Sequence, residues 1–205
     1  MIFTTHLILR ILKENGCDCI YLNNYIMKKT LLTILAGVAL MTSCSQSKEY
    51  VIYGTVSDTK LEGAKIYLVP FDKHEKEDID STYIKNHTFE FRGTEERMVD
   101  IRLERRRRFG VQSLLVVTEP GSTYVTIGEV SVGRGTPQND SLQAWKSLTM
   151  QFNEEMAQLS KAGLTEEMKA LQDAHMDRTL QMASNVGTHT TLGSFLEARV
   201  ARAKK

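Results

Sequence analysis

YVIYGTVSDTKLEGAKIYLVPFD, from Tyr50 to Asp72, holds the pattern that decides the fold. Two runs dense in Val, Ile and Tyr are separated by Ser57-Asp58-Thr59 and Glu62-Gly63. β-Branched and aromatic side chains suit a pleated strand, whereas Asp, Ser and Gly favour turns. The stretch therefore predicts two short strands joined by a tight connection.

Short strand-like runs continue beyond this stretch as far as residue 139. Thr82-Tyr83-Ile84 and Phe89-Glu90-Phe91 flank Asn86-His87, and Asn and His both tolerate the positive φ that a two-residue hairpin turn requires. Three more runs follow, namely MVDIRLE (98–104), SLLVVTEPG (113–121) and TYVTIGEVSV (123–132). Six or seven strands at this spacing predict an antiparallel β-sandwich over residues 50–139, with a small barrel as the alternative.

The apolar spacing becomes helical from Asp140 onward. Apolar residues recur every three or four positions at Leu142, Trp145, Leu148, Phe152, Met156 and Leu159. This stripe is expected to pack on the sandwich; the alternative is an exposed surface that binds a partner.

Helix ends can be predicted in the same segment. Asn139 or Asp140 is expected to cap the first helix, and Gly163 to end it. Thr165 is expected to cap a second helix, whose apolar face carries Met168, Leu171, His175 and Met182. A third helix is expected from Leu192 to about Ala203. Residues 140–205 therefore form two or three helices, and the fold class is mainly β with α.

MKKTLLTILAGVALMTSCSQ, residues 27–46, has the layout of a secretory signal. Lys28 and Lys29 precede an apolar run that is too short for the ~20 residues of a membrane-spanning helix. Met41-Thr42-Ser43-Cys44 resembles the lipobox of bacterial lipoproteins, which implies cleavage between Ser43 and Cys44 and lipid on Cys44. Residues 27–43 are then the signal peptide and 44–49 a short tether. The alternative is an ordinary signal peptide with a chance cysteine.

Residues 1–26 would bury this signal inside the chain. We therefore expect a mis-assigned start, with Met27 as the true first residue; an N-terminal extension is the alternative. Cys17 and Cys19 have C-x-C spacing rather than the C-x-x-C of redox and zinc motifs.

Composition excludes several classes of function. The chain carries 26 Lys and Arg against 25 Asp and Glu, a formal charge of +1, which gives no general attraction for nucleic acid. Beyond residue 43 the only cysteine is Cys44, which the lipid would occupy. No Ser-His-Asp order, glycine-rich phosphate loop or metal-ligand spacing is found, so we expect no catalytic residue, metal or cofactor.

Arg105-Arg106-Arg107-Arg108 is the most conspicuous charged feature. Four guanidinium groups could bind lipid headgroups, lipopolysaccharide phosphates or an acidic partner. The alternative, which we favour, is a solvated loop between two strands.

Other polar groups are interpreted as structural. His74 lies among Asp and Glu residues in a charged loop, His87 in a turn, and His175 on an apolar helix face. Glu95-Glu96 and Glu166-Glu167 are assigned to a loop and to the first turn of a helix.

Ordered motifs carry a family resemblance. They are Gly54, Val56 and 62–68 (G-x-V and E-G-A-x-I-Y-L), 80–93 (D-S-x-x-I-x-N-x-x-F-x-F-x-G), 119–122 (E-P-G-S) and 135–142 (G-T-P-x-N-D-x-L). The series resembles a domain of unknown function at the N-terminus of thioredoxin-like (AhpC/TSA and TlpA-type) lipoproteins of Gram-negative envelopes. In that family a thioredoxin domain with C-x-x-C follows, and no residue here matches those cysteines.

Two functions from different classes follow. We favour a non-enzymatic binding or interaction module, held in a Gram-negative cell envelope by lipid on Cys44. It would take a protein partner in the envelope and no nucleic acid; its ligand and oligomeric state stay open, as does its orientation on the outer membrane. The alternative is the accessory domain of a thiol-disulfide oxidoreductase system, stand-alone or truncated before its thioredoxin domain.

Overall fold

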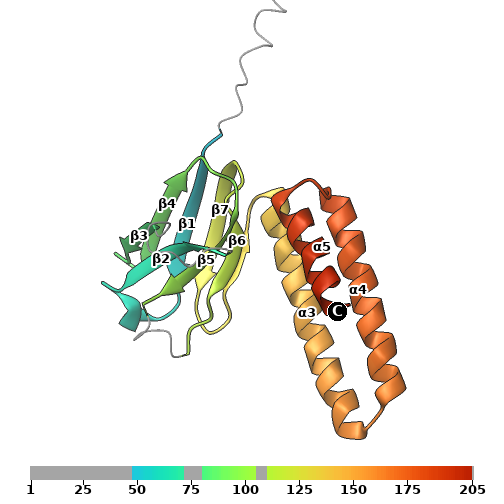
Figure 1. Cartoon of the computed structure of the whole chain (residues 1–205). Helices are drawn as coiled ribbons and strands as arrows, with labels where there is room; N and C mark the ends of the chain where they lie inside the picture. The colour runs from blue at the N-terminus through green and yellow to red at the C-terminus, as the bar shows by residue number, and fades with distance from the viewer. Residues whose placement is uncertain (1–47, 72–79, 105–109, 205) are drawn as a thin grey trace, which may run out of the picture. The chain divides into compact units, whose positions relative to one another are not determined.

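Two β-sheets followed by helices make up the part of the chain that the computed structural model describes, residues 48–71, 80–104 and 110–204 (Figure 1). The strands are β1 (Tyr50–Val56), β2 (Lys65–Pro70), β3 (Asp80–Tyr83), β4 (Thr88–Gly93), β5 (Met98–Leu103), β6 (Leu114–Val117), β7 (Gly121–Ile127) and β8 (Val132–Arg134). The helices are the short 3-10 helix η1 (Thr59–Leu61), then α3 (Pro137–Ala162), α4 (Thr165–Val186) and α5 (Thr191–Ala203).

Each sheet has four strands. Sheet A has the order β4-β1-β7-β8 and sheet B the order β3-β2-β5-β6. All neighbours are antiparallel except β1 and β7, which run parallel in register from Tyr50 opposite Gly121 to Val56 opposite Ile127. The predicted sandwich with helices after it is confirmed, and within the described residues the sheets do not close into the alternative barrel.

The strand count exceeds the prediction because the expected run 123–132 contains a turn. Ser131 Oγ accepts a hydrogen bond from Gly128 N at 3.1 Å and donates one to Gln112 O at 2.7 Å, which holds the chain reversal between β7 and β8. The short strand β8 (Val-Gly-Arg) has no apolar alternation that a sequence pattern could detect.

The inner faces of the two sheets form the main core. Alternate residues of sheet A, among them Ile52, Phe91 and Val125, pack against alternate residues of sheet B such as Ile66 and Ile101. Side chains two residues apart on a strand share a face, so the residues between them point outward. Burial thereby fixes which residues of β1, β4 and β7 face away from the core.

Two glycines on the inner side of sheet A lie beneath aromatic rings of the paired strand. Gly54 of β1 is opposite Phe89 of β4, and Gly93 of β4 is opposite Tyr50 of β1. A Cβ added to Gly54 would lie 2.0 Å from Phe89 Cζ, and one added to Gly93 would lie 2.6 Å from Tyr50 Oη. Each of the two strands thus has one glycine that lies under an aromatic ring of the other strand. A shift in pairing would separate both glycines from these rings, so the two contacts stabilise the β1–β4 register.

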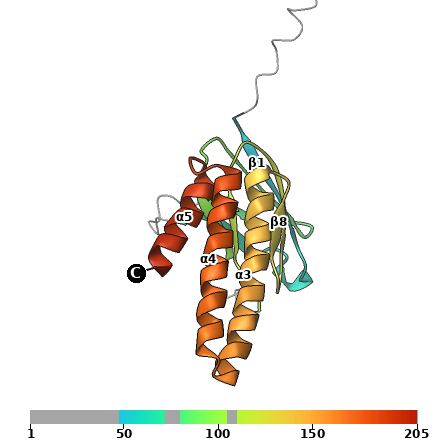
Figure 2. The same cartoon turned by 90° about the vertical axis from the view of Figure 1, so that its right-hand side faces the viewer.

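The helices pack on the outer face of sheet B (Figure 2). Val99 and Val116 point into the sandwich core, whereas Met98 and Val117 belong to a second core that contains helix residues. The helical members of this second core are Leu142, Trp145, Ala183, Leu192 and Leu196. Helix α3 also packs along β8, the edge strand of sheet A, where Gln143 Oε1 accepts a hydrogen bond from Gly133 N at 3.2 Å. Tyr53 and Tyr124, on the outer face of β1 and β7, stay exposed.

The Asn86-His87 turn is confirmed. The two residues have φ of 52° and 60°, as a two-residue hairpin turn requires. The Glu62 carboxylate accepts hydrogen bonds from Asn86 N at 2.8 Å and His87 N at 2.9 Å. These backbone hydrogen bonds, chiefly the one from His87, lower the pKa of Glu62.

The predicted N-terminal caps of the long helices are wrong. Helix α3 begins at Pro137, and its first free N–H groups bond to Glu119, which precedes β7: Gln138 N lies 2.7 Å and Asn139 N 3.2 Å from Glu119 Oε1. The Asn139 side chain instead pairs with the backbone of Val117 in β6: its Oδ1 accepts a hydrogen bond from Val117 N at 2.9 Å, and its Nδ2 donates one to Val117 O at 2.8 Å. A distant carboxylate thus replaces the local cap.

The predicted start of α4 is wrong, whereas the predicted end of α3 is confirmed. Leu164, not Thr165, is the N-terminal flanking residue of α4, without a side-chain capping bond. Gly163 does end α3, with φ of 70°. The proximal part of the predicted stripe, Leu142 and Trp145, is buried as expected, whereas the side chains from Leu148 onward are only half-buried.

Candidate functional site

The outer face of sheet A carries a row of side chains across all four strands. In strand order the row reads Glu90 (β4), Tyr53 (β1), Tyr124 (β7) and Arg134 (β8), since these residues are paired in the ladders. Cross-strand partners point to the same side of a sheet. We call this row, together with the adjacent threonines Thr55, Thr88 and Thr126, the tyrosine face.

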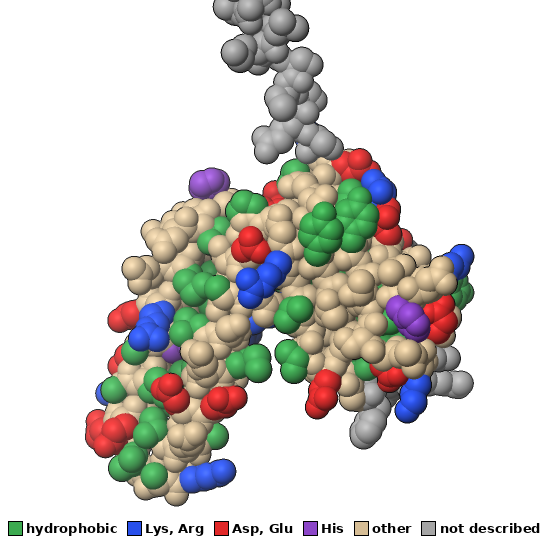
Figure 3. All heavy atoms as spheres, turned by 180° about the vertical axis from the view of Figure 1, so that it is seen from behind, with side chains coloured by type: hydrophobic (Ala, Val, Ile, Leu, Met, Phe, Trp, Pro, Cys, Tyr) green, Lys and Arg blue, Asp and Glu red, His purple; other side chains and the backbone are tan. Residues whose placement is uncertain are grey.

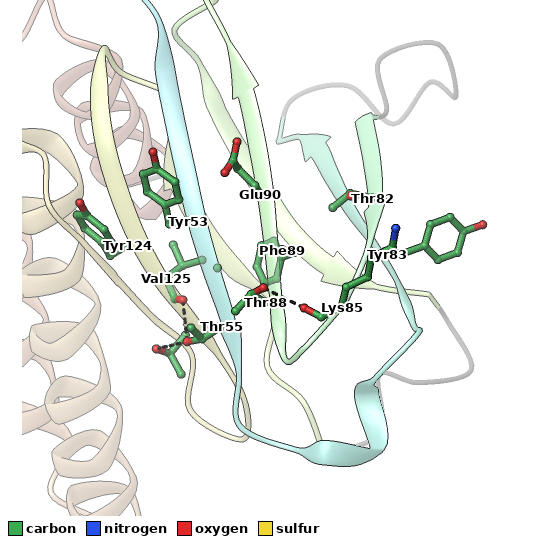
Figure 4. A pocket seen from close by; sticks show the side chains of 12 residues that line it. Tyr53, Thr55, Thr82, Tyr83, Lys85, Thr88, Phe89, Glu90, Tyr124 and Val125 are labelled. Carbon is green, nitrogen blue, oxygen red and sulfur yellow. Dashed lines mark hydrogen bonds between the residues drawn. The ribbon is translucent and has the colours of Figure 1, made fainter.

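Tyr53 and Tyr124 stack on each other at the centre of the face. Their ring centroids lie 5.5 Å apart with 22° between the ring planes. Tyr53 is 38% and Tyr124 61% exposed, although tyrosines bury much apolar area when a core accepts them. Figure 4 shows both rings standing up from their strands, beside Glu90 of β4.

Three threonines form the next row. Thr88, Thr55 and Thr126 are paired across β4, β1 and β7. Thr55 Oγ1 lies 3.1 Å from Thr126 Oγ1 and donates to Val125 O at 3.3 Å. Thr88 Oγ1 donates to Lys85 O at 2.9 Å (Figure 4). Each hydroxyl still has acceptor capacity for a ligand, because a hydroxyl oxygen carries two lone pairs.

Charged groups flank the aromatic pair. Glu90 pairs with Arg92 on the same strand, and this contact raises the pKa of the Arg92 guanidinium. Figure 3, seen from behind, shows hydrophobic side chains between acidic and basic ones over the sandwich. The face is therefore mixed in character: an apolar centre with hydrogen-bonding groups on both sides.

A hollow of about 680 Å³ lies over this face. Its floor and walls include the tyrosine pair, the three threonines and Glu90, and Thr82, Tyr83 and Lys85 close one side. The Tyr83 side chain projects away from the tyrosine pair (Figure 4). The volume is that of a small-ligand site, but the hollow is shallow and open to solvent.

A glycine lies close to each of the two tyrosines. Gly135, with φ of 120°, lies against Tyr124, where an added Cβ would come within 3.1 Å of Tyr124 Cδ2. Gly54, next to Tyr53, is held under Phe89. A side chain at either glycine would therefore displace an aromatic ring of sheet A.

A second set of polar groups joins the sandwich to the helices. The Gln138 side chain donates to Glu96 Oε1 at 2.8 Å and accepts from Leu192 N at 2.9 Å, at the start of α5. Thr191 Oγ1 also donates to Glu96 Oε1, at 2.8 Å. Every member has partners, so this cluster is a structural junction.

Most predicted site residues lie outside the described part of the chain. These are the cleavage and lipidation residues Ser43 and Cys44, His74, and the arginine patch from Arg105 to Arg108. The predicted segments 1–26 and 27–43 also lie outside the described residues. The lipid anchor and the arginine patch therefore stay predictions.

The other histidines and paired glutamates can be placed. His87 lies in the predicted turn. His175 packs on Phe152 at 4.3 Å between ring centroids, and burial, with Arg178 nearby, lowers its pKa. Glu95 lies 3.5 Å from Arg97, and Glu96 belongs to the junction above. Glu166 and Glu167 occupy the first turn of α4.

The described residues contain neither a metal-binding cluster nor a membrane-spanning helix. No group of three His, Cys, Asp or Glu side chains is arranged to hold a metal ion. None of the helices there has the length and apolar character needed to cross a bilayer.

Sequence reasoning did not identify the tyrosine face. The alternation in YVIYGTV and GSTYVTI does place Tyr53 and Tyr124 on the polar side of their strands. Their contact, however, depends on the parallel pairing of β1 with β7, which no local pattern specifies.

The comparison with known proteins gives one match. No curated protein and no solved structure matches the chain. Residues 50–142, which take in both sheets and the start of α3, match the family described as "Domain of unknown function (DUF4369)", and this part of the chain is a domain of that family.

Proposed function

We propose that the protein is a non-enzymatic binding module of the cell envelope, tethered by lipid on Cys44, whose ligand surface is the tyrosine face. The observation that carries the proposal is the exposed Tyr53–Tyr124 stack, which lines a hollow on the outer face of sheet A. Exposed aromatic patches bounded by polar groups are typical of interaction sites.

The competing explanation is purely structural. Aromatic pairs across neighbouring strands stabilise a sheet by about 0.2–1 kcal/mol without any ligand. That explanation accounts for the stack, but it requires neither the hollow nor the row of threonine hydroxyls beside it. Binding measurements on tyrosine variants distinguish the two.

The chemistry of the face suits a ligand made of hydroxylated rings, that is, a saccharide. One face of a sugar ring is apolar and packs on an aromatic ring, while its hydroxyls need donors and acceptors around the edge. Tyr53 and Tyr124 supply the aromatic surface, and the threonine row and Glu90 supply the hydrogen-bonding groups. No metal or cofactor is needed for such binding.

The anchor would hold this face near a membrane. Five residues lie between Cys44 and the start of β1 at Tyr50, and an extended chain spans at most ~20 Å over those six peptide steps. Two or three acyl chains give stable attachment, since each buried methylene contributes about 0.8 kcal/mol. The alternative role, as the accessory domain of a thiol-disulfide oxidoreductase system, requires no cysteine in this domain, and the three cysteines, at positions 17, 19 and 44, lie outside the described residues.

The anchor is tested by the intact mass of the protein purified from native membranes. The proposal predicts a chain that begins at Cys44 and carries two or three acyl chains. An unmodified chain that begins at Met1 would remove both the anchor and the envelope location.

The binding role is tested on a panel of immobilised oligosaccharides. We compare the wild-type protein with Tyr53→Ala/Tyr124→Ala and with Tyr67→Ala, a matched control on the outer face of sheet B. The proposal predicts the same bound saccharides for wild type and control, and a loss of about tenfold or more for the double variant. Equal binding by all three proteins would place the ligand elsewhere.

A further inference from the structure

We infer that the groove between α3 and α4, beside the C-terminal turns of α5, is the docking site for an acidic amphipathic helix of a partner protein. This site is separate from the tyrosine face, and it involves a protein partner rather than a saccharide. The inference rests on three features: the unequal lengths of the helices, the lining of the groove and its charge.

The three helices differ in length. Helix α3 has 26 residues and α4 has 22, whereas α5 has only 13. At 1.5 Å per residue, α3 extends for about 39 Å and α5 for about 20 Å. The α3–α4 hairpin therefore extends well past the end of α5 (Figure 2).

Helix α5 shows what kind of element packs against this hairpin. It presents Leu192, Leu196 and Val200, which are spaced by four residues and buried. Phe195 of the same helix contacts Trp145 of α3 edge-to-face, with ring centroids 5.7 Å apart. An amphipathic helix is thus the natural occupant of this groove, and a second one would continue the interface that α5 has begun.

The groove beside the C-terminal turns of α5 has a volume of about 470 Å³. Trp145 and Phe152 of α3, Met176 of α4 and Val200 of α5 supply its apolar lining. Phe152 is fixed by its ring contact with His175. Trp145 is buried and oriented by the hydrogen bond from its Nε1 to Thr179 Oγ1 at 3.3 Å. The apolar side chains of a docking helix would therefore pack on residues that are already held in position by contacts within the protein.

The charge of the groove specifies the partner further. Arg199 and Arg202 lie on its rim, and no Asp or Glu is among its lining residues. Within the described part of the chain neither arginine forms an ion pair. Complementarity thus favours a helix that carries Glu or Asp beside its apolar stripe.

The chain's only tryptophan, Trp145, reports directly on the groove. The probe is a synthetic helical peptide of about 18 residues, without Trp or Tyr, that has Leu at heptad positions a and d and Glu at the flanking positions. Titration of the full chain with this peptide is expected to shift Trp145 emission in a saturable manner. The same peptide with Lys in place of Glu is expected to bind about tenfold or more weakly.

Charge reversal supplies the decisive variants. Arg199→Glu/Arg202→Glu is expected to weaken binding of the acidic peptide by about tenfold or more and to improve binding of the Lys peptide, a reversal that simple misfolding would not produce. Lys161→Glu/Lys169→Glu, on exposed positions of the same hairpin outside the groove lining, is the matched control and should bind like wild type.

Three results would overturn the inference. They are equal binding of the Glu and Lys peptides, unchanged binding by the Arg199/Arg202 variant, or a dimer in analytical ultracentrifugation that excludes the peptide. The last result would mean that a second copy of this chain covers the groove.

Discussion

Tyr53 of β1 stacks on Tyr124 of β7, with ring centroids 5.5 Å apart, although 71 positions separate the two residues in the chain. The contact exists because β1 and β7 are the one parallel pair among the described strands, which sets Tyr53 directly opposite Tyr124. The helices pack against sheet B and along the β8 edge of sheet A, and the stack on β1 and β7 stays exposed to solvent.

Gly54→Ala is predicted to destabilise the sandwich by about 1–3 kcal/mol. The new methyl group would lie 2.0 Å from Phe89 Cζ, so the ring must leave its place over the strand. Urea denaturation measures the cost, and Glu129→Ala, at an exposed position after β7, is the control, expected within about 0.5 kcal/mol of wild type. Adding Phe89→Leu should recover part of the loss, because the shorter side chain makes room; a purely additive double variant would contradict the account.

Glu119→Ala is predicted to lower the free energy of unfolding by about 1–3 kcal/mol. It leaves the N–H groups of Gln138 and Asn139 buried at the start of α3 without their acceptor. Glu119→Gln keeps one acceptor oxygen and should cost less. Glu129→Ala, at an exposed position after β7, serves as the control. Equal losses for the Ala variants at 119 and 129 would argue against the distant cap.

Lys146 is predicted to make the free energy of unfolding depend on pH. Burial lowers the pKa of Lys146 to about 8, although nearby Asp100 opposes the shift. Its Nζ donates to Leu115 O at 3.4 Å. Between pH 8 and 10.5 the unfolded chain binds a proton at this lysine that the folded chain does not, so its contribution to stability rises with pH over that interval.

The variant Lys146→Met isolates this contribution from the other groups that titrate at high pH. The stability of wild type relative to Lys146→Met should increase from pH 8 to 10.5, measured by denaturation at each pH. Lys161→Met, an exposed position on α3, should show no such trend relative to wild type. A constant difference between wild type and Lys146→Met would mean that the Lys146 amine is not desolvated.

The general architecture could be predicted from the sequence because its signals are local. Alternating apolar residues identified most strands, Gly163 marked the end of α3, and Asn86-His87 marked a turn with positive φ. The helix caps could not be predicted in this way. Glu119 caps α3 from a position that precedes β7, whereas the local candidates Asn139 and Asp140 bond elsewhere, to Val117 and Gly135.

The candidate site was beyond sequence reasoning for a related reason. Tyr53, Thr55, Tyr124 and Thr126 each look like ordinary outward-facing strand residues, which are common on any sheet surface. Only the strand order β4-β1-β7-β8 assembles them into one face. The helical groove likewise depends on the early end of α5 relative to α3 and α4.

The most direct test of the central claim is a map of the bound ligand on the ¹⁵N-labelled protein. The full chain is titrated with the saccharide that binds most tightly on the oligosaccharide panel, and amide chemical shifts are followed by NMR. The account predicts that the largest changes fall on Tyr53, Thr55, Tyr124 and Thr126 and on Thr88 and Glu90 of β4, and that they vanish in Tyr53→Ala/Tyr124→Ala. Changes confined to sheet B or the helices, or equal changes in the double variant, would contradict it.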